Sequence, residues 1–136
     1  GLSMHNIIST LKAYPHKRII VLFGAIGEKN QIRRKELGLV AGREADLSIL
    51  TTEDPGREDP VKIAEEIASY IRQTGGKYMI IRDRREAIVY ALSHMQKGDI
   101  LVLAGKGNET FMKINGGMIP YSEREEVEKY IKSKKN

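Results

Sequence analysis

The chain has 136 residues, a formal net charge of +5, 40% hydrophobic residues and no cysteine. This length suits one domain with its own hydrophobic core, and the absence of cysteine excludes disulfides and thiol chemistry. No apolar run approaches the roughly 20 residues of a membrane span, and the N-terminus lacks the pattern of a signal peptide. We therefore expect a soluble, cytoplasmic, single domain over residues 1–136.

The excess of positive charge does not predict a nucleic-acid partner. Part of it lies in the C-terminal stretch KYIKSKKN, which is typical of a solvated helix end, and the other charges are mixed in sign. Aromatic residues are only 6% of the chain, and no basic face with interleaved aromatic side chains is visible. We expect neither nucleic acid nor a membrane as a partner.

Helix and strand signals alternate in the first half of the chain. Residues 6–14 are amphipathic and predict a helix that Pro15 ends. The continuous apolar run over 18–24 predicts a strand that is buried on both faces. Residues 33–45 then predict a helix, and residues 46–50 predict a second short strand.

The clearest helix signal covers residues 59–74, where isoleucines repeat every four positions on one face. Asp59 is the expected N-cap, and Pro60 suits the first helical position. The remaining predicted elements are a strand over 77–83, a helix over 84–95, a strand over 100–105, a hairpin over 110–121 and a helix over 122–131.

Two further helix starts carry capping signals. Asp83 and Arg84 follow a predicted strand end, where they could join the site, but a helix cap at Asp83 with a local ion pair of Arg84 is the commoner arrangement and is the one we expect. Ser122 and Glu125 have the spacing of a capping box at the start of the last helix.

The alternation predicts an α/β fold with a mostly parallel sheet, helices on both faces and a C-terminal β-hairpin. In such sheets a ligand binds beyond the carboxyl ends of the strands, near the point where the strand order reverses. Three loops with reactive side chains leave those ends, over residues 24–36, 51–60 and 105–109. The candidate site therefore lies where these loops converge.

These loops do not form a self-contained nucleotide site. The first loop has glycines and basic residues, which suit an anion at a helix start, but it does not match GxGxxG. The chain contains no GxxxxGK[ST] motif, so the domain is not expected to bind and split ATP unaided. The three histidines have no metal-ligand spacing, and we expect no metal site in the chain.

Both signs of charge meet at the predicted site. Arginine pairs with carboxylates in a bidentate manner, and carboxylates pair with ammonium groups, so the arrangement suits a zwitterion such as a free amino acid. Glu58 and Asp59 are expected only to favour the positive end of the following helix. The charged side chains expected at the site are Glu53, Asp54, Glu109, Arg33, Arg34 and, later in the loop of Glu53, Arg57.

Five motifs in one order resemble the C-terminal domain of the Mur ligases, most closely of the MurE type. They are GAIGEKNQIRRKELG, TTEDPGREDP, DRREAI, AGKGNE and GGMIPYSERE. The resemblance covers nearly the whole chain and implies a Rossmann-like three-layer fold. It also implies that residues 1–136 are the amino-acid-binding domain of a longer three-domain bacterial enzyme.

The resemblance implies an ATP-dependent ligase that forms an amide bond in peptidoglycan synthesis. In the family, a central domain binds ATP and Mg²⁺ and phosphorylates the carboxylate of UDP-N-acetylmuramoyl-L-alanyl-D-glutamate. The C-terminal domain brings the third residue of the stem peptide, whose amine attacks the acyl phosphate. We therefore expect no catalytic residue in this chain and no activity from the domain alone.

The resemblance also implies roles for single residues. Arg34 matches the arginine that holds the carboxylate of the amino acid, and Gly105 and Glu109 match the lining of the same pocket. Arg33 matches a basic position near the nucleotide when the domains close. Asn108 replaces the usual histidine of GKGHE, so no role is carried over to it.

The loop TTEDPGREDP bears on the identity of the amino acid. Family members that add meso-diaminopimelate carry D-N-P-R, whose arginine binds the distal carboxylate. Here Glu53 and Asp54 begin the four positions and Gly56 ends them, so two acids would attract the distal ammonium of L-lysine and repel a carboxylate. This favours L-lysine. Arg57, one position later, keeps diaminopimelate open, and ornithine also fits.

Two other functions remain as alternatives. One is a neighbouring ligase, either another Mur ligase or a folylpolyglutamate-type enzyme, which would use glutamate or alanine as the acceptor. The other is a free-standing α/β module that binds a nucleotide or regulates another protein, which a gene ending at these boundaries would support.

Overall fold

Four parallel strands form the central sheet of the computed structural model, which describes residues 3–24, 31–105, 111–114, 117–120 and 122–134. Their order across the sheet is β3-β2-β1-β4. The bounds are Ile19–Phe23 for β1, Leu47–Leu50 for β2, Tyr78–Ile80 for β3 and Ile100–Leu103 for β4. The chain passes from β1 through β2 to β3 and then returns to the far side of β1, so the strand order reverses between β1 and β4.

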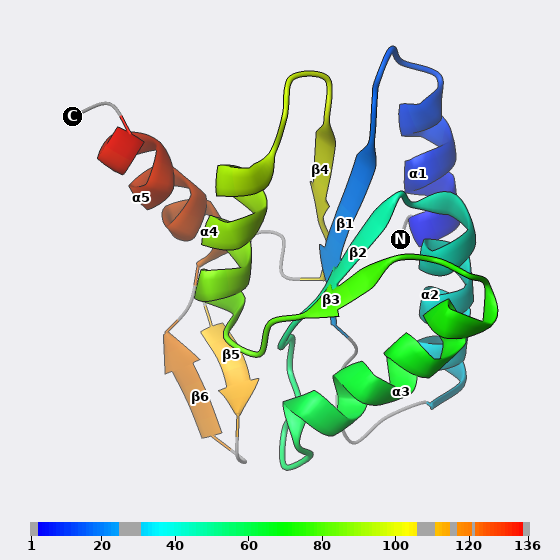
Figure 1. Cartoon of the computed structure of the whole chain (residues 1–136). Coiled ribbons are helices and arrows are strands. Elements are labelled where there is room, and N and C mark those ends of the chain that lie inside the picture. The colour runs from blue at the N-terminus through cyan, green and yellow to red at the C-terminus, as the bar shows by residue number, and fades with distance from the viewer. Residues whose placement is uncertain (1–2, 25–30, 106–110, 115–116, 121, 135–136) are drawn as a thin grey trace.

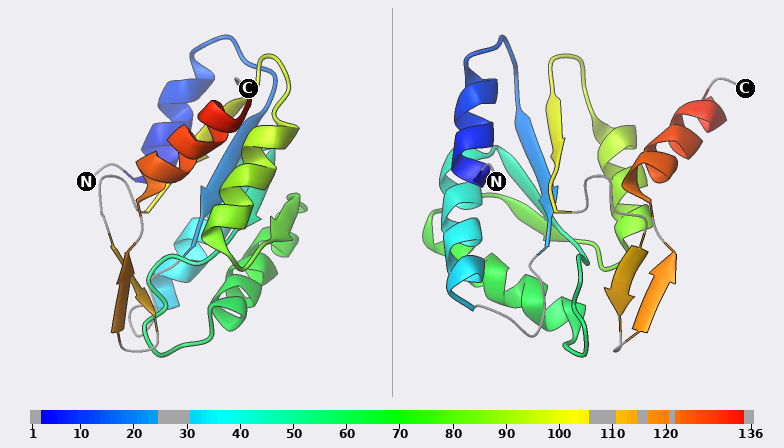
Figure 2. Two further views of the ribbon diagram at one scale, coloured as in Figure 1. Left: turned by 90° about the vertical axis from the view of Figure 1, so that its left-hand side faces the viewer. Right: turned by 180° about the vertical axis from the view of Figure 1, so that it is seen from behind.

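Helices cover both faces of this sheet (Figures 1 and 2). Three of them pack on one face, namely α1 (Met4–Lys12), α2 (Gln31–Glu44) and α3 (Pro60–Gln73). On the other face α4 (Arg84–His94) contacts the sheet, and α5 (Glu123–Lys134) lies against α4. The prediction of a three-layer α/β fold with a parallel sheet is confirmed.

The predicted C-terminal hairpin is also present. β5 (Phe111–Ile114) pairs antiparallel with β6 (Gly117–Pro120), and the two form a separate sheet. Figure 1 places this hairpin beyond the carboxyl ends of the parallel strands, on the side of α4 and α5. The two residues that join its strands, 115 and 116, lie outside the described part of the chain.

The central strand β1 explains why the apolar run over 18–24 is unbroken. Ile19, Val21 and Phe23 pack among the helices α1 to α3, whereas Ile20 and Leu22 pack against α4. All five side chains are buried, because β1 has a layer of helices on each face. Burying one such side chain contributes about 1.5–3 kcal/mol, so this strand anchors both halves of the core.

The predicted caps are confirmed at three helices. Asp59 accepts a hydrogen bond from Val61 N at 2.9 Å, and Asp83 accepts from Arg85 N at 2.8 Å. At the last helix, Ser122 Oγ accepts from Glu125 N at 3.3 Å. The first helix begins at Met4, two residues before the predicted start, because Ser3 caps it. Periodicity shows where a helix buries its side, but the capping residue decides where it begins.

Within the residues that the structure describes, no helix is long and apolar enough to cross a membrane.

Candidate functional site

A cavity of about 240 Å³ opens at the carboxyl ends of β1 and β4, where the strand order reverses. Ligand pockets commonly have about 300–1,000 Å³, so this one suits a ligand as small as an amino acid. Its position agrees with the rule for open parallel sheets. The described residues that line it are Met4, Phe23, Gly24, Arg33, Leu37, Glu53, Ala104 and Gly105.

Glycines at two strand ends let the walls of this cavity approach one another. Gly24 follows β1, and a Cβ at this position would collide with the carbonyl oxygen of Thr51. Gly105 follows β4 with a φ of +106°, and a Cβ there would collide with the carboxylate of Glu53. Glycine is required at Gly105 both for its backbone conformation and for the space that the Glu53 side chain occupies.

Glu53 is the buried acid of the cavity. Only 8% of this residue is exposed, although it lies three residues beyond Leu50, the last residue of β2. Its carboxylate lies against Gly105, so the loops after β2 and β4 meet in one wall. The prediction that these two loops converge at the carboxyl end of the sheet is confirmed for this pair.

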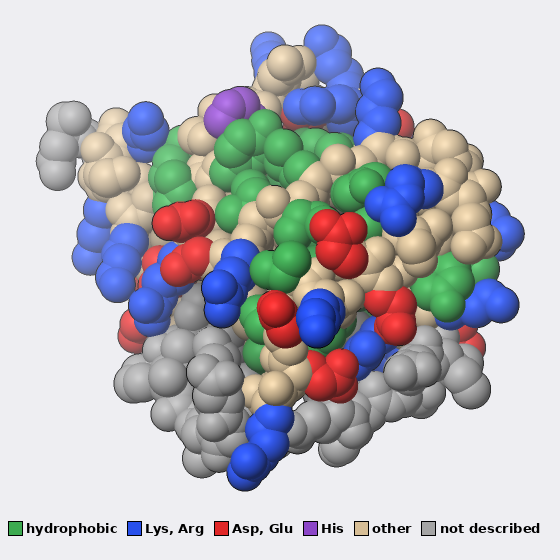
Figure 3. Space-filling model, turned by 60° about the horizontal axis from the view of Figure 1, so that its bottom comes forward, with side chains coloured by type: hydrophobic (Ala, Val, Ile, Leu, Met, Phe, Trp, Pro, Cys, Tyr) green, Lys and Arg blue, Asp and Glu red, His purple; other side chains and the backbone are tan. Residues whose placement is uncertain are grey.

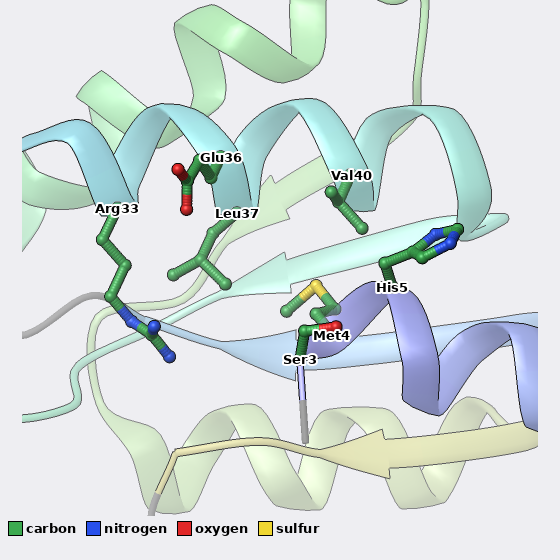
Figure 4. Close-up of a pocket in the computed structure, with 7 residues that line it drawn as sticks. All are labelled: Ser3, Met4, His5, Arg33, Glu36, Leu37 and Val40. Atoms are coloured by element: carbon green, nitrogen blue, oxygen red, sulfur yellow. The ribbon is translucent and has the colours of Figure 1, made fainter. Parts of the chain in front are cut away.

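Arg33 supplies the basic side of the cavity. Its exposed side chain projects from the first turn of α2 and lines both this cavity and a second hollow of about 100 Å³ between α1 and α2. Figure 4 shows Arg33, Leu37 and Met4 around this second hollow, with Glu36, Val40, Ser3 and His5 along its length. Met4, Arg33 and Leu37 line both hollows, so the two are neighbours along α2.

Arg34, by contrast, is turned toward α3 and is only 3% exposed. Its Nη2 donates to Glu58 at 3.0 and 3.1 Å, and its Nη1 donates to Glu66 at 3.1 Å. Burial opposes the charge of the guanidinium, but the hydrogen bonds to Glu58 and Glu66 outweigh burial and raise the pKa of Arg34. Among the described residues, its Nε has no hydrogen-bond partner.

Glu58 therefore has a contact that helix-dipole reasoning did not anticipate. We expected it only to favour the start of α3, and instead it forms an ion pair with Arg34 on α2. Asp59 alone acts as the expected cap. Three acids of the loop after β2 therefore have different roles. Glu53 lines the cavity, Glu58 pairs with Arg34, and Asp59 caps α3.

The other predicted site residues are placed as follows. Asp54 is half-buried and Arg57 is exposed, and neither is among the described residues that line the cavity. Gly56 between them has a φ of +60°, a left-handed conformation that favours glycine. Glu109 lies outside the described residues.

The prediction of a local ion pair for Arg84 is wrong. Instead of a local ion pair, its guanidinium pairs with Glu123 of α5, with Nη2 and Oε1 at 2.8 Å. It also donates to the carbonyl oxygens of Thr52 at 3.0 Å and Ala104 at 2.8 Å. Only 2% of Arg84 is exposed. Removing one partner of such a buried pair costs about 3–5 kcal/mol.

The surface around the carboxyl end of the sheet carries both signs of charge. Figure 3 shows acidic and basic side chains interspersed there, without a patch of one sign among the described atoms. Within the described ranges, no three His, Cys, Asp or Glu side chains are grouped to hold a metal ion. The arrangement can bind an ammonium group at Glu53 and an anion at Arg33.

Most of the chain matches a known protein family. The family described as Mur ligase, glutamate ligase domain, matches residues 2–107. The chain belongs to the Mur ligase family. The match covers more than half of the chain and includes Arg33, Glu53 and Gly105.

Relatives of this Mur ligase domain carry two different names. The UDP-N-acetylmuramoyl-L-alanyl-D-glutamate--2,6-diaminopimelate ligase of Caldanaerobacter subterraneus subsp. tengcongensis is 44% identical over 94% of this chain and 27% of its own length. The corresponding L-lysine ligase of Streptococcus sanguinis is 43% identical over 89% of this chain and 25% of its own length. The chain thus spans about a quarter of these relatives, and overall identity does not distinguish the two amino acids.

A solved structure confirms the fold of the Mur ligase domain. A diaminopimelate ligase of the same name superposes with a TM-score of 0.89 and 32% identity, covering 97% of this chain and 27% of that one. The resemblance that the five sequence motifs indicated is therefore confirmed at the level of family and fold.

Proposed function

We propose that this Mur ligase domain binds the incoming amino acid, with L-lysine favoured, for an ATP-dependent ligase acting on UDP-N-acetylmuramoyl-L-alanyl-D-glutamate. The observation that carries the proposal is the cavity at the switch point, where the carboxylate of Glu53 is buried against Gly105 with Arg33 on another wall. A carboxylate on the wall of a small cavity can accept charge-assisted hydrogen bonds from an ammonium group, and the side chain of lysine ends in one.

The amino acid would contact this chain at two places. Glu53 and Asp54 would receive the distal ammonium, with Gly105 and Glu109 in the same pocket. Arg34 would bind the carboxylate, which would take the place that Glu58 holds on its Nη2. Arg34 is cationic at every physiological pH, as any arginine is, and so can bind a carboxylate. Arg33, on the cavity wall, would face the nucleotide when the domains close.

ATP and Mg²⁺ belong to the part of the longer ligase that lies outside this chain, because the sequence has no GxxxxGK[ST] motif. Their chemistry is activation of the acceptor carboxylate as an acyl phosphate. The amine of the amino acid then attacks the acyl carbon, the bond from this carbon to the phosphate oxygen breaks, and the amine loses a proton. The role of this domain is to orient the amine, and positioning of this kind is a large part of such catalysis.

A test of this function follows ADP release by the full-length ligase with the UDP-linked dipeptide, offering L-lysine and meso-diaminopimelate separately. Turnover with lysine alone supports the reading of Glu53 and Asp54 as ammonium ligands. Turnover with glutamate or alanine only, or with no amino acid at all, contradicts the proposed function.

A second candidate is the same reaction with meso-diaminopimelate, since a relative of that name is 44% identical. Arg57 would then bind the distal carboxylate from one position beyond Gly56, whose left-handed conformation bends the loop. In that case turnover occurs with diaminopimelate, and R57A abolishes the preference. If lysine is the substrate, R57A changes the KM for lysine little.

A further inference from the structure

One arginine outside the cavity holds both strand ends that form its walls. Arg84 Nη1 donates to the carbonyl of Thr52, which directly precedes Glu53, and its Nη2 donates to the carbonyl of Ala104, which directly precedes Gly105. Glu53 and Gly105 are the two residues in contact across the cavity wall. The guanidinium therefore ties the backbone just before each of them.

The sheet itself cannot make this connection. β2 and β4 are not neighbours, because β1 lies between them in the order β3-β2-β1-β4. The last ladder bonds run from Thr51 N to Phe23 O and from Ala104 N to Leu22 O, both to β1. The carbonyls of Thr52 and Ala104 lie past this point, and the guanidinium that reaches them comes from the first turn of α4.

Two further contacts hold this guanidinium in place. The carboxylate of Glu123, at the start of α5, accepts from Nε at 3.0 Å and from Nη2 at 2.8 Å. The hydroxyl of Thr52 donates to the carbonyl of Arg82 at 2.6 Å, which fixes the β2 end to the segment just before α4. The side chains of Arg84 and Glu123 are 1% and 6% exposed, so water does not compete for these bonds.

We propose that Arg84 is a positioning residue, which sets the separation of Glu53 and Gly105 and thereby the affinity of the site for the amino acid. This inference rests on the proposed function, since it needs the cavity to be the amino-acid site. Only a planar guanidinium has donors in a fixed fork that can reach two carbonyls and a carboxylate together. A lysine at this position keeps the charge beside Glu123 but cannot hold both strand ends.

The test uses the full-length ligase carrying R84K, with KM measured separately for the amino acid, for ATP and for the UDP-linked dipeptide. The expected result is a KM for the amino acid raised about tenfold, as for the loss of one hydrogen bond to a charged group, with the other two KM values unchanged. The matched control is R85K, because Arg85 forms the neighbouring α4–α5 ion pair with Glu126 at 2.9 Å. R85K should leave all three KM values within about twofold, as for a partly exposed pair.

An unchanged KM for the amino acid in folded R84K overturns the inference, and so does an equal loss in all three KM values. If R84K does not fold, the variant E123Q tests the inference instead. It replaces one of the two oxygens that accept from the guanidinium by an amide group that cannot accept, so the guanidinium is no longer held against the two carbonyls. A selective rise of about threefold in the KM for the amino acid supports the inference, and no rise overturns it. A wild-type ligase that uses no amino acid overturns the proposed function, and the inference with it.

Discussion

The two ends of the parallel sheet use similar charged residues in different ways. At the amino end, Arg18 forms a bidentate pair with Asp99 at 2.6 and 3.1 Å and so joins the starts of β1 and β4, which are neighbouring strands. At the carboxyl end, Arg84 joins the ends of β2 and β4, which are not neighbours, and Arg34 joins α2 to the loop before α3. The cavity of about 240 Å³ lies at the carboxyl end, where Arg84 joins strands that are not adjacent in the sheet.

The difference lies in what each pair encloses. At the amino end the aspartates also bind nearby backbone. Asp46 accepts from Ile19 N at 2.7 Å, and Asp99 accepts from Gln96 N at 2.9 Å. At the carboxyl end, side chains rather than ladder bonds connect the backbone past the strand ends, and the cavity lies beside these segments. Substitutions at the carboxyl end should therefore change ligand binding, whereas those at the amino end should change stability alone.

The largest effect is expected from G105A. The added Cβ takes the space of the Glu53 carboxylate, and we expect ligation by the full-length enzyme to fall by about 100-fold or more, or about 2.7 kcal/mol. The backbone strain at a φ of +106° adds a loss of stability of about 1–3 kcal/mol. Steady-state kinetics and thermal unfolding measure the two effects separately.

The control for G105A is G75A, because Gly75 has a φ of +75° but nothing within 4 Å of an added Cβ. It should lower the stability by a similar strain of about 1–3 kcal/mol and leave ligation unchanged. Equal losses of activity in the two variants would mean that strain, and not the collision with Glu53, explains the loss.

The next effect is expected from E53Q. An amide cannot give a full charge to the distal ammonium, so the KM for lysine should rise by about 10- to 100-fold, the range for hydrogen bonds to charged groups. D46N is the matched control at the amino end, where Asp46 accepts from Ile19 N. It should leave the KM for lysine unchanged. A similar KM for E53Q and the wild type would show that Glu53 does not bind the ammonium group of lysine.

A smaller effect of opposite sign is expected from E58Q. Glu58 holds the guanidinium of Arg34 and competes with the carboxylate of the amino acid, so weakening this pair should lower the KM for the amino acid by about threefold. E65Q removes the same charge from the exposed side of α3 and should have no effect. A higher KM for E58Q would show that Glu58 orients Arg34 for the ligand instead.

The smallest effect on binding is expected from D99N, which acts at the amino end only. Its hydrogen bond with Arg18 lowers the pKa of Asp99 below the ordinary value of 3.8, so the ionised carboxylate stabilises the folded state. This contribution is fully present above the ordinary pKa and is lost as the pH falls through the lowered pKa of the folded state. Thermal unfolding should show a wild-type advantage over D99N that disappears on acidification below about pH 4. The KM for the amino acid should not change at neutral pH.

Local signals in the sequence predicted most of the fold. The unbroken apolar run around β1, the four-residue repeat of Ile63, Ile67 and Ile71 in α3 and the caps at Asp59 and Asp83 all depend on residues close in the chain. The order of five motifs likewise predicted the Mur ligase family, which is confirmed. Such features need no knowledge of which segments meet in space.

The tertiary structure alone decided how the site is assembled. The sequence offered two adjacent arginines and two adjacent acids, and the fold places Arg33 and Glu53 on the cavity while Arg34 turns to Glu58. Adjacent residues on a helix or at a strand end point in different directions, so their roles depend on what packs on each side. The reach of Arg84 to two strand ends follows from the strand order, in which β1 separates β2 from β4, and no local pattern in DRREAI encodes that order.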